Sequence, residues 1–363
     1  MKYLSEYRNI EATKQILDHL EKSVTRPWNI MEICGGQTHG LVRNGILELL
    51  PDKIRMIHGP GCPVCVTPLH LIDKAIALLE QGVILCSFGD MIRVPGSKQS
   101  LLEAKAKGGD LRILYSPLEA VNIAKNNPDK EVVFFAVGFE TTAPANALSV
   151  LHAEKEGLKN YSILVSHVLV PPAMEAILDD EYCNIDAFLG AGHVCAIMGY
   201  KEYHPLVEKY KIPIIITGFE PLDLVQGIQL AVNQLERGIH LVENQYSRVV
   251  KEDGNSNAIQ IIRQVFEVGD REWRGIGMIP NSGYRLTKNY RAFDAESKFG
   301  IEGIKVSEHP NCMAGEVLKG IKKPVNCPEF GTTCTPANPL GAPMVSSEGA
   351  CSAYYNFSEH SMR

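Results

Sequence analysis

The chain has 363 residues and a formal net charge of −6, and 45% of its residues are hydrophobic, which is the composition of a globular protein with a sizeable buried core. This acidic balance does not suit nucleic acid as the main partner, because phosphate binding requires a basic face. No run of 18 apolar residues occurs, so we expect no membrane span. The N-terminus lacks the apolar segment of a signal peptide, and we therefore expect a cytoplasmic protein. Ten cysteines in such a chain indicate metal or redox chemistry rather than a disulfide scaffold.

Short apolar segments alternate with helical patterns along most of the chain. After an amphipathic helix expected over residues 3–22, buried strands are predicted near residues 28–33, 53–58, 83–88 and 112–115, and again near 131–137, 161–167, 185–189 and 213–217. The helical patterns between them include Leu69–Glu80, Pro144–Glu156 and Leu222–Arg237. Such alternation is typical of parallel sheets that are buried on both faces. The fold class is therefore predicted to be α/β.

The strands predict two similar parallel-sheet domains, each built from βαβ units. A pattern repeated at two strand ends, Ala136–Glu140 and Ile216–Glu220, indicates an internal duplication. Beyond residue 238 the alternation stops, with one more helix expected over 255–268 and a strand or loop over 275–286. We expect four parts along the chain. Residues 1–25 form an N-terminal helix that packs on the body, and residues 26–118 form an α/β domain with the thiol motifs. Residues 119–238 form a second α/β domain, and residues 239–363 form a C-terminal cysteine-rich iron–sulfur domain.

The loop after the expected strand 53–58 contains a Cys-X-X-Cys pair, Cys62 and Cys65. Its Gly and Pro content predicts a turn, after which Thr67 can cap a helix that begins with Pro68. Such a strand-to-helix loop lowers the pKa of a thiol, because backbone N–H groups and the positive helix end favour the thiolate. We interpret the pair as a redox or soft-metal site, with a structural zinc half-site as the alternative.

Cys34 and His39 begin and end the segment Cys-Gly-Gly-Gln-Thr-His that follows the first strand. Ligands of open α/β sheets bind at the carboxyl ends of the strands, so we expect these two residues in one cleft with Cys62 and Cys65. Three thiols and an imidazole suit iron, zinc or copper(I). A helix-capping or packing role is the alternative for His39.

Other polar residues and thiols have less specific surroundings. Glu140 lies beside two threonines at a strand end and is a candidate for ligand binding or proton transfer, the alternative being a helix N-cap formed by a threonine hydroxyl. His193 is a loop imidazole to which the sequence assigns no role. Three further cysteines in or near apolar segments are most simply buried side chains, namely Cys86, Cys183 and Cys195.

Four cysteines in the tail are separated by 14, 6 and 16 residues, a spacing that matches neither a ferredoxin nor a zinc finger. Four thiolates suit zinc and iron–sulfur equally. Because the tail has little apolar periodicity, we expect a metal centre to hold it together. A nearby redox pair favours iron–sulfur over zinc, since zinc carries no electrons. Glu348 is a candidate for handling protons there, or a solvated loop carboxylate. The predicted cluster ligands are Cys312, Cys327, Cys334 and Cys351.

Three motifs and the tail cysteines together resemble the HypD family of hydrogenase maturation proteins. The motifs are Cys34–His39, Gly59–Pro68 and Gly138–Pro144, and the similarity extends over essentially the whole chain. Gln37 departs from the family pattern, in which we expect a histidine in many members.

The resemblance implies a maturation factor of [NiFe] hydrogenases rather than a conventional turnover enzyme. It implies a HypC-type small chaperone as partner, a HypE-type protein as cyanide donor and the hydrogenase large subunit as indirect recipient. It further implies that an iron with two cyanides and one carbon monoxide is assembled transiently with Cys34 as its ligand on this chain. Cys62 and Cys65 would then be the redox pair, and the tail cysteines would hold a [4Fe–4S] cluster. Two other classes are retained: an iron–sulfur-dependent thiol–disulfide oxidoreductase acting on another protein, and a zinc-stabilised α/β binding module.

Overall fold

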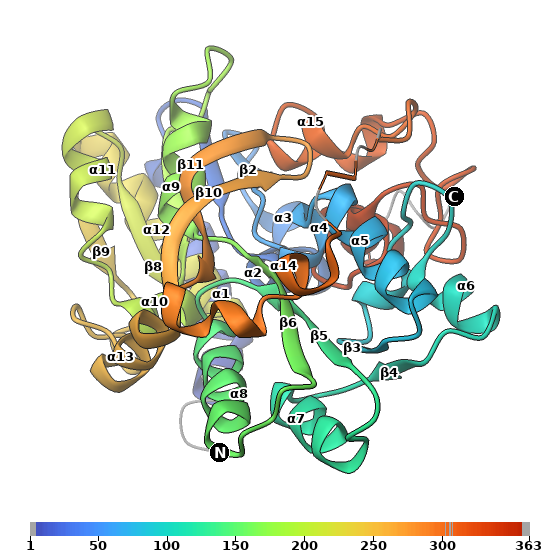
Figure 1. The fold of residues 1–363 in the computed structure, drawn as a ribbon. Helices are drawn as coiled ribbons and strands as arrows, with labels where there is room; N and C mark the ends of the chain where they lie inside the picture. Colours follow the sequence, from blue (N-terminus) through green and yellow to red (C-terminus); the bar gives the residue numbers. More distant parts are fainter. Residues whose placement is uncertain (1–4, 302, 305, 307, 358–363) are drawn as a thin grey trace.

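The computed structural model describes residues 5–301, 303, 304, 306 and 308–357, and within them two parallel β-sheets form the body of the protein (Figure 1). Sheet A has the order β2-β1-β7-β8-β9, and sheet B has the order β4-β3-β5-β6. The strands of sheet A are β1 (Trp28–Glu32), β2 (Ile54–His58), β7 (Ala187–Ala191), β8 (Ile214–Thr217) and β9 (Val242–Asn244). The strands of sheet B are β3 (Ile84–Ser87), β4 (Leu111–Ile113), β5 (Val132–Gly138) and β6 (Tyr161–His167).

Helices cover both faces of each sheet, so inner strands such as β5 and β8 are buried along their whole length. One face of sheet A packs on α1 (Ile10–Ser23), α2 (Gly35–Arg43) and α12 (Pro221–Arg237), and the other on α9 (Val170–Leu178) and α11 (Tyr203–Tyr210). One face of sheet B packs on α5 (Leu69–Glu80) and α6 (Leu101–Ala106), and the other on α7 (Pro117–Asn126) and α8 (Ala143–Lys155). The predicted α/β class is therefore confirmed.

All eight predicted strands form, but the predicted grouping of strands into domains 26–118 and 119–238 is wrong for the sheets. β1 pairs with β7 on one side and β2 on the other, whereas β3 and β4 join β5 and β6. The chain leaves sheet A after β2 through α4 (Pro63–Val66) and α5, builds all of sheet B, and returns through α9 to β7. Each sheet thus takes strands from both predicted domains. β9 completes sheet A although it lies in the predicted C-terminal domain.

The strand order of sheet A decides which loops meet. Because neighbouring parallel strands end at the same edge of a sheet, the loops after β1, β2, β7 and β8 lie side by side there. The segments directly after these strands carry Cys34, Cys62, His193 and Phe219 in that order along the chain, and His193 lies in the first turn of α10. The edge therefore collects thiols and an imidazole from segments far apart in the sequence.

An antiparallel hairpin follows the body of the fold. The helix expected over 255–268 is the shorter α13 (Ser256–Val265), which ends where β10 (Phe266–Trp273) begins. β10 pairs with β11 (Gly277–Leu286), so the segment expected as strand or loop is a strand. In Figure 1 this hairpin, drawn in orange, reaches across the body toward α15 (Ala314–Leu318).

The two ends of the described chain pack on sheet A and its loops. The predicted N-terminal helix is α1, capped by the side chain of Asn9 and packed on α12, and residues 3 and 4 of the prediction lie outside the described residues. The tail has little regular structure and packs against α2 and α4. The remaining short elements are η1 (Ser5–Arg8), α3 (Ile46–Leu49), η2 (Met91–Arg93), α10 (Gly192–Met198), η3 (Lys288–Phe293), α14 (Ala295–Phe299), η4 (Pro324–Asn326), η5 (Ala342–Met344) and α16 (Ala350–Phe357). In the part of the chain that the structure describes, no helix is both long and apolar enough to cross a membrane.

Candidate thiol site

Cys62 and Cys65 are joined by a disulfide at the start of α4. Cys62 caps this one-turn helix, since its sulfur accepts a hydrogen bond from the Cys65 N–H at 3.2 Å, and Pro63 occupies the first helical position. The predicted turn is therefore helical over residues 63–66. The Thr67 hydroxyl does not cap α5 as expected but donates to the Pro63 carbonyl at 2.9 Å. Both cysteines are buried, so the pair lies at a helix N-terminus below the surface.

Cys34 lies directly against the disulfide loop, at the end of β1 and the start of α2. The Gly35 N–H donates to the Gly61 carbonyl at 2.9 Å. A Cβ on Gly61 would lie 2.3 Å from the Cα and N atoms of Cys34, so the two backbones touch and a side chain does not fit between them. The three thiol-bearing residues predicted to share a site are thus brought together. Cys34 is only 2% exposed, however, and does not face an open cleft.

The imidazole beside Cys34 belongs to His193 rather than to His39. The Sγ atom of Cys34 lies 3.6 Å from Nδ1 of His193, and the ring of Phe219 packs on that imidazole with centroids 5.1 Å apart. Burial lowers the pKa of His193 to about 4, and burial together with the nearby Glu348 charge raises the pKa of Cys34. At neutral pH the pair is therefore an uncharged thiol and an uncharged imidazole. This is a soft donor set for a metal cation that displaces the thiol proton.

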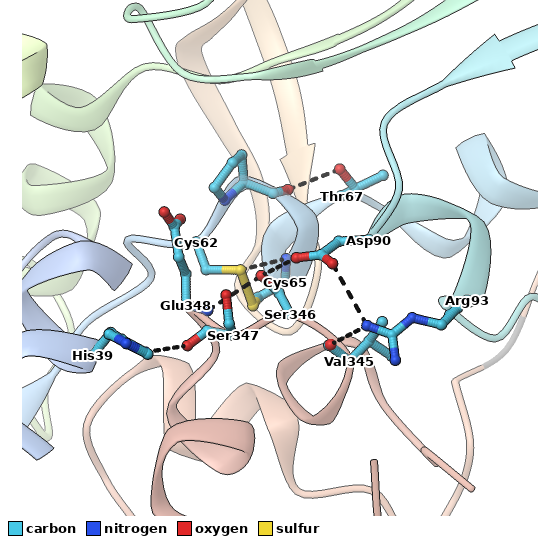
Figure 2. The surroundings of a disulfide bond; sticks show 11 residues. His39, Cys62, Cys65, Thr67, Asp90, Arg93, Val345, Ser346, Ser347 and Glu348 are labelled. Carbon is cyan, nitrogen blue, oxygen red and sulfur yellow. Dashed lines mark hydrogen bonds and ion pairs between the residues drawn. A yellow bond between two sulfur atoms is a disulfide. The ribbon is translucent and has the colours of Figure 1, made fainter. Parts of the chain in front are cut away.

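His39 contacts the tail. Its Nδ1 atom lies 3.1 Å from the Ser347 carbonyl oxygen (Figure 2), and its ring packs edge-on against Phe357 with centroids 5.2 Å apart. The exposed residue Glu348 packs its backbone on Gly35, where an added Cβ would lie 2.6 Å from the Glu348 carbonyl oxygen. His39 thus holds the tail against α2, and Glu348 lies near Cys34 and the disulfide (Figure 2).

The tail loop 345–348 lies beside the disulfide and is also held from sheet B (Figure 2). The Ser346 hydroxyl donates to Asp90 at 3.0 Å, and Arg93 donates to the Val345 carbonyl at 3.0 Å. Arg93 in turn pairs with Asp90 at 3.5 Å. Because Asp90 and Arg93 follow β3, both sheets fix the position of this loop over the thiols.

A buried carboxylate network that sequence reasoning missed lies beneath the site. Glu32, the last residue of β1, accepts hydrogen bonds from the Cys34 N–H at 3.1 Å and from the Thr38 hydroxyl. Its other contact is His58, whose Nδ1 atom lies 2.7 Å from the carboxylate and whose Nε2 atom lies 3.0 Å from the Tyr354 hydroxyl in α16. The signal in the sequence was a carboxylate that ends a mostly apolar strand, two residues before Cys34.

Gln37, at the position where we expected a histidine, has a packing role. Its Nε2 atom donates to the Gly190 carbonyl at 3.0 Å and to the Thr217 hydroxyl at 2.6 Å. These bonds tie α2 to the ends of β7 and β8, which helps to keep Cys34 and His193 at a fixed distance.

Glu140 lies at the end of a sheet B strand, two residues after β5. Its Oε1 atom accepts the Val170 N–H at 2.9 Å, and its Oε2 atom is buried with no hydrogen-bond partner among the described residues. Burial raises the pKa of Glu140 to about 8. The alternative of a threonine cap does not hold, because the Thr142 side chain makes no cap bond to α8. Glu140 is a largely protonated acid at neutral pH and joins the β5 loop to α9.

The three other body cysteines differ in exposure. Cys86 and Cys195 are fully buried in apolar clusters, and burial raises the pKa of each to about 12. Both are therefore inert packed side chains, as predicted. Cys183 is only partly buried, at the edge of the core beneath α9.

The four tail cysteines line one pocket between α15, η5 and α16. Burial, and then the three neighbouring thiols, raise the pKa of Cys351, so the sulfurs are close enough to repel one another as thiolates. The Leu340 N–H donates to the Cys334 sulfur at 3.4 Å. Across the described ranges, no three His, Cys, Asp or Glu side chains are grouped so that they could hold a metal ion.

We predict that Gly61→Ala destabilises the protein by about 1–3 kcal/mol, the usual cost of an extra carbon in a packed site. The new Cβ overlaps the backbone of Cys34, which cannot move without breaking its bond to Glu32. Urea denaturation would measure the loss. Gly89→Ala is the matched control, because its Cβ would be 3.7 Å from the nearest atom, the Cγ2 of Ile113. Equal stability of the two variants would contradict the described contact.

We predict that Glu140→Gln stabilises the protein at alkaline pH. Between the ordinary carboxyl pKa of 4.5 and the folded value of about 8, the unfolded chain releases a proton that the folded chain keeps, so wild-type stability falls as the pH rises. Glutamine is uncharged throughout and retains an oxygen for the Val170 N–H. The advantage of the variant should therefore grow from about pH 5 to about pH 8 and then level off.

Urea denaturation at several pH values would measure this trend. Glu267→Gln, at an exposed carboxylate paired with Arg285, is the control and should show no comparable growth. A constant difference between Glu140→Gln and wild type from pH 5 to pH 9 would refute the buried-acid assignment.

Comparison with known proteins confirms the resemblance seen in the motifs. Residues 11–358 match the family model described as HypD, hydrogenase formation hypA family. The chain is 46% identical to hydrogenase maturation factor HypD2 of Bradyrhizobium diazoefficiens over 377 aligned residues, which cover 100% of this chain and 99% of that protein. It is 46% identical to HypD of Rhodobacter capsulatus and 44% identical to HypD of Escherichia coli, with 98% of each chain covered in both cases. The chain belongs to the HypD family of hydrogenase formation proteins.

Proposed function

We propose that this hydrogenase maturation factor is the cytoplasmic scaffold on which an iron carrying two cyanides and one carbon monoxide is assembled for a [NiFe] hydrogenase. The observation that carries the proposal is the position of Cys34. Its sulfur lies 3.6 Å from the neutral imidazole of His193, and its backbone touches the disulfide loop. A metal-binding thiol and a redox-active pair are thereby available at one edge of the sheet.

The iron is the cargo of this site, and Cys34 is its ligand on this chain. An iron cation displaces the thiol proton, since coordination favours the thiolate, and Glu348, whose charge acts on Cys34, is the candidate acceptor of that proton. One thiolate and one imidazole do not complete the coordination of iron. A HypC-type small chaperone supplies a further thiolate, a HypE-type protein supplies cyanide, and the hydrogenase large subunit receives the product.

The Cys62–Cys65 pair stores electrons for the site by cycling between the disulfide and the dithiol form. Reduction of the Cys62–Cys65 bond takes up two electrons and two protons and leaves two thiols, and re-oxidation returns them. The pair lies at the start of α4, and its loop touches the backbone of Cys34. This position next to Cys34 lets the pair exchange electrons with chemistry at the iron.

The tail cysteines fit a [4Fe–4S] cluster as the resident cofactor. All four thiols line one pocket, and a backbone N–H donates to one sulfur, as is usual at iron–sulfur sites. Each thiolate of such a cluster binds a different iron atom, so the four sulfurs need not converge on one point as they must around a single zinc ion. Cys312, Cys327, Cys334 and Cys351 would hold the cluster, which supplies single electrons.

We predict that Cys34→Ala abolishes the cyanide-bearing iron and leaves the tail cluster in place. The full chain, purified anaerobically with its small chaperone partner, should show infrared bands of metal-bound cyanide and carbon monoxide, and about four further iron atoms in the cluster. In Cys34→Ala the bands should vanish while those four iron atoms persist. Cys86→Ala, at a fully buried thiol in sheet B, is the control and should keep the bands.

Other outcomes would point elsewhere. Undiminished bands in Cys34→Ala would show that another residue holds the iron. Wild-type protein with the cluster but without the bands would favour the thiol–disulfide oxidoreductase, and a colourless, zinc-loaded protein would favour the binding module.

A further inference from the structure

Arg274 is a buried cation in the turn between β10 and β11. Its side chain is 3% exposed, and its Nη1 atom is buried with no hydrogen-bond partner in the described part of the chain. Burying a guanidinium is costly unless its N–H groups are satisfied. An orphaned donor on a buried guanidinium requires an explanation.

Arg274 lies between the two groups of cysteines. On one side its backbone N–H donates to the Val66 carbonyl at 2.8 Å, directly after Cys65. On the other side its neighbour Gly275 packs on the helix that follows Cys312. An added Cβ on Gly275 would lie 2.5 Å from the Cα atom of Gly315. The turn is therefore wedged between the disulfide helix and the first cysteine of the tail.

The guanidinium reaches toward the tail rather than toward the disulfide loop. Its Nε and Nη2 atoms donate to Glu308 at 3.1 and 2.7 Å. Gly275, the residue after Arg274, lines one pocket together with Cys312, so the turn that carries the guanidinium lies beside this cysteine. Glu308 is 45% exposed, and water therefore screens its charge more than it screens the buried charge of Arg274.

Packing alone does not account for the guanidinium. The contact with Val66 uses the backbone of Arg274, which any residue except proline can supply, and the ion pair with the exposed Glu308 contributes little. What the arginine adds is a fixed positive charge and a free N–H in the turn that packs on the helix following Cys312.

We propose that Arg274 is a positioning residue that raises the reduction potential of the cluster held by the tail cysteines, with its free Nη1–H directed to a cluster sulfur. This inference rests on the proposed function. Reduction of the cluster adds one negative charge, and a nearby buried cation stabilises the reduced form more than the oxidised form. Hydrogen bonds to cluster sulfurs act in the same direction. Arg274 thereby links the potential of the cluster to the hairpin that contacts the disulfide helix.

The test is a redox titration of the full chain, loaded with its cluster and followed by optical and electron paramagnetic resonance spectra. Arg274→Gln should lower the reduced-to-oxidised ratio at a fixed potential about tenfold, which is a shift of about 59 mV for a one-electron couple. Arg274→Lys should restore part of the shift, since it keeps the charge but not the planar fork. The control is Arg285→Gln on the same hairpin, an exposed arginine paired with Glu267, and it should titrate like wild type.

If Arg274→Gln loses the cluster, its reduction potential cannot be measured, and the potential of Glu308→Gln is the test instead. Removing the carboxylate charge of Glu308 leaves the charge of Arg274 less neutralised, so the reduction potential of the cluster should rise. This rise should be smaller than the fall in Arg274→Gln. If Arg274→Gln keeps its cluster, a reduction potential equal to that of wild type would overturn the inference. If Arg274→Gln holds no cluster, a wild-type potential in Glu308→Gln would overturn it. Either result leaves the cluster assignment intact. Absence of iron and sulfide from the wild-type chain would instead remove the proposed cofactor itself.

Discussion

The buried carboxylate of Glu32 is the contact on which the arrangement of the thiol site depends. It ends β1, accepts the N–H of Cys34 and the hydroxyl of Thr38, and pairs with His58, which contacts Tyr354 in α16. Burial raises the pKa of this carboxyl group, and His58 opposes the rise. Removing one partner of a buried pair usually costs about 3–5 kcal/mol, because the other is left uncompensated. One side chain thus fixes the ends of two strands, the start of α2 and the last helix relative to one another.

The tail is part of the site because the body holds it from several directions. It has few apolar residues with which to form a core of its own. Tyr354 nevertheless contacts His58 in sheet A, Ser347 contacts His39 in α2, and Ser346 contacts Asp90 after a strand of sheet B. These contacts set the four tail cysteines at a defined place beside the disulfide helix. The candidate thiol site therefore lies where the two sheets and the tail meet.

The sequence predicted where the strands lie along the chain better than it predicted which strands pair with each other. Buried strands are recognisable because apolar segments of parallel sheets are nearly uniform, but that uniformity carries no information about which strand pairs with which. Assigning β7 to the second domain left His193 without a role, although the true order places it beside Cys34. The cysteine motifs were predicted correctly as neighbours, since loops at the same sheet edge must meet. Glu32 was missed because a single carboxylate at a strand end looks like a solvated terminus until its partners are seen.

The central claim is that the tail cysteines and the Cys62–Cys65 disulfide form one electron-exchanging centre. The most direct measurement supplies a one-electron donor, reduced methyl viologen, to anaerobic full-length protein and follows disulfide reduction by thiol alkylation and peptide mass spectrometry. We expect the wild-type chain to form the Cys62 and Cys65 dithiol rapidly, because two successive electrons can pass through the cluster. The cluster-free variant Cys351→Ser should keep its disulfide under the same conditions. Equal rates of dithiol formation in the two proteins would contradict the account.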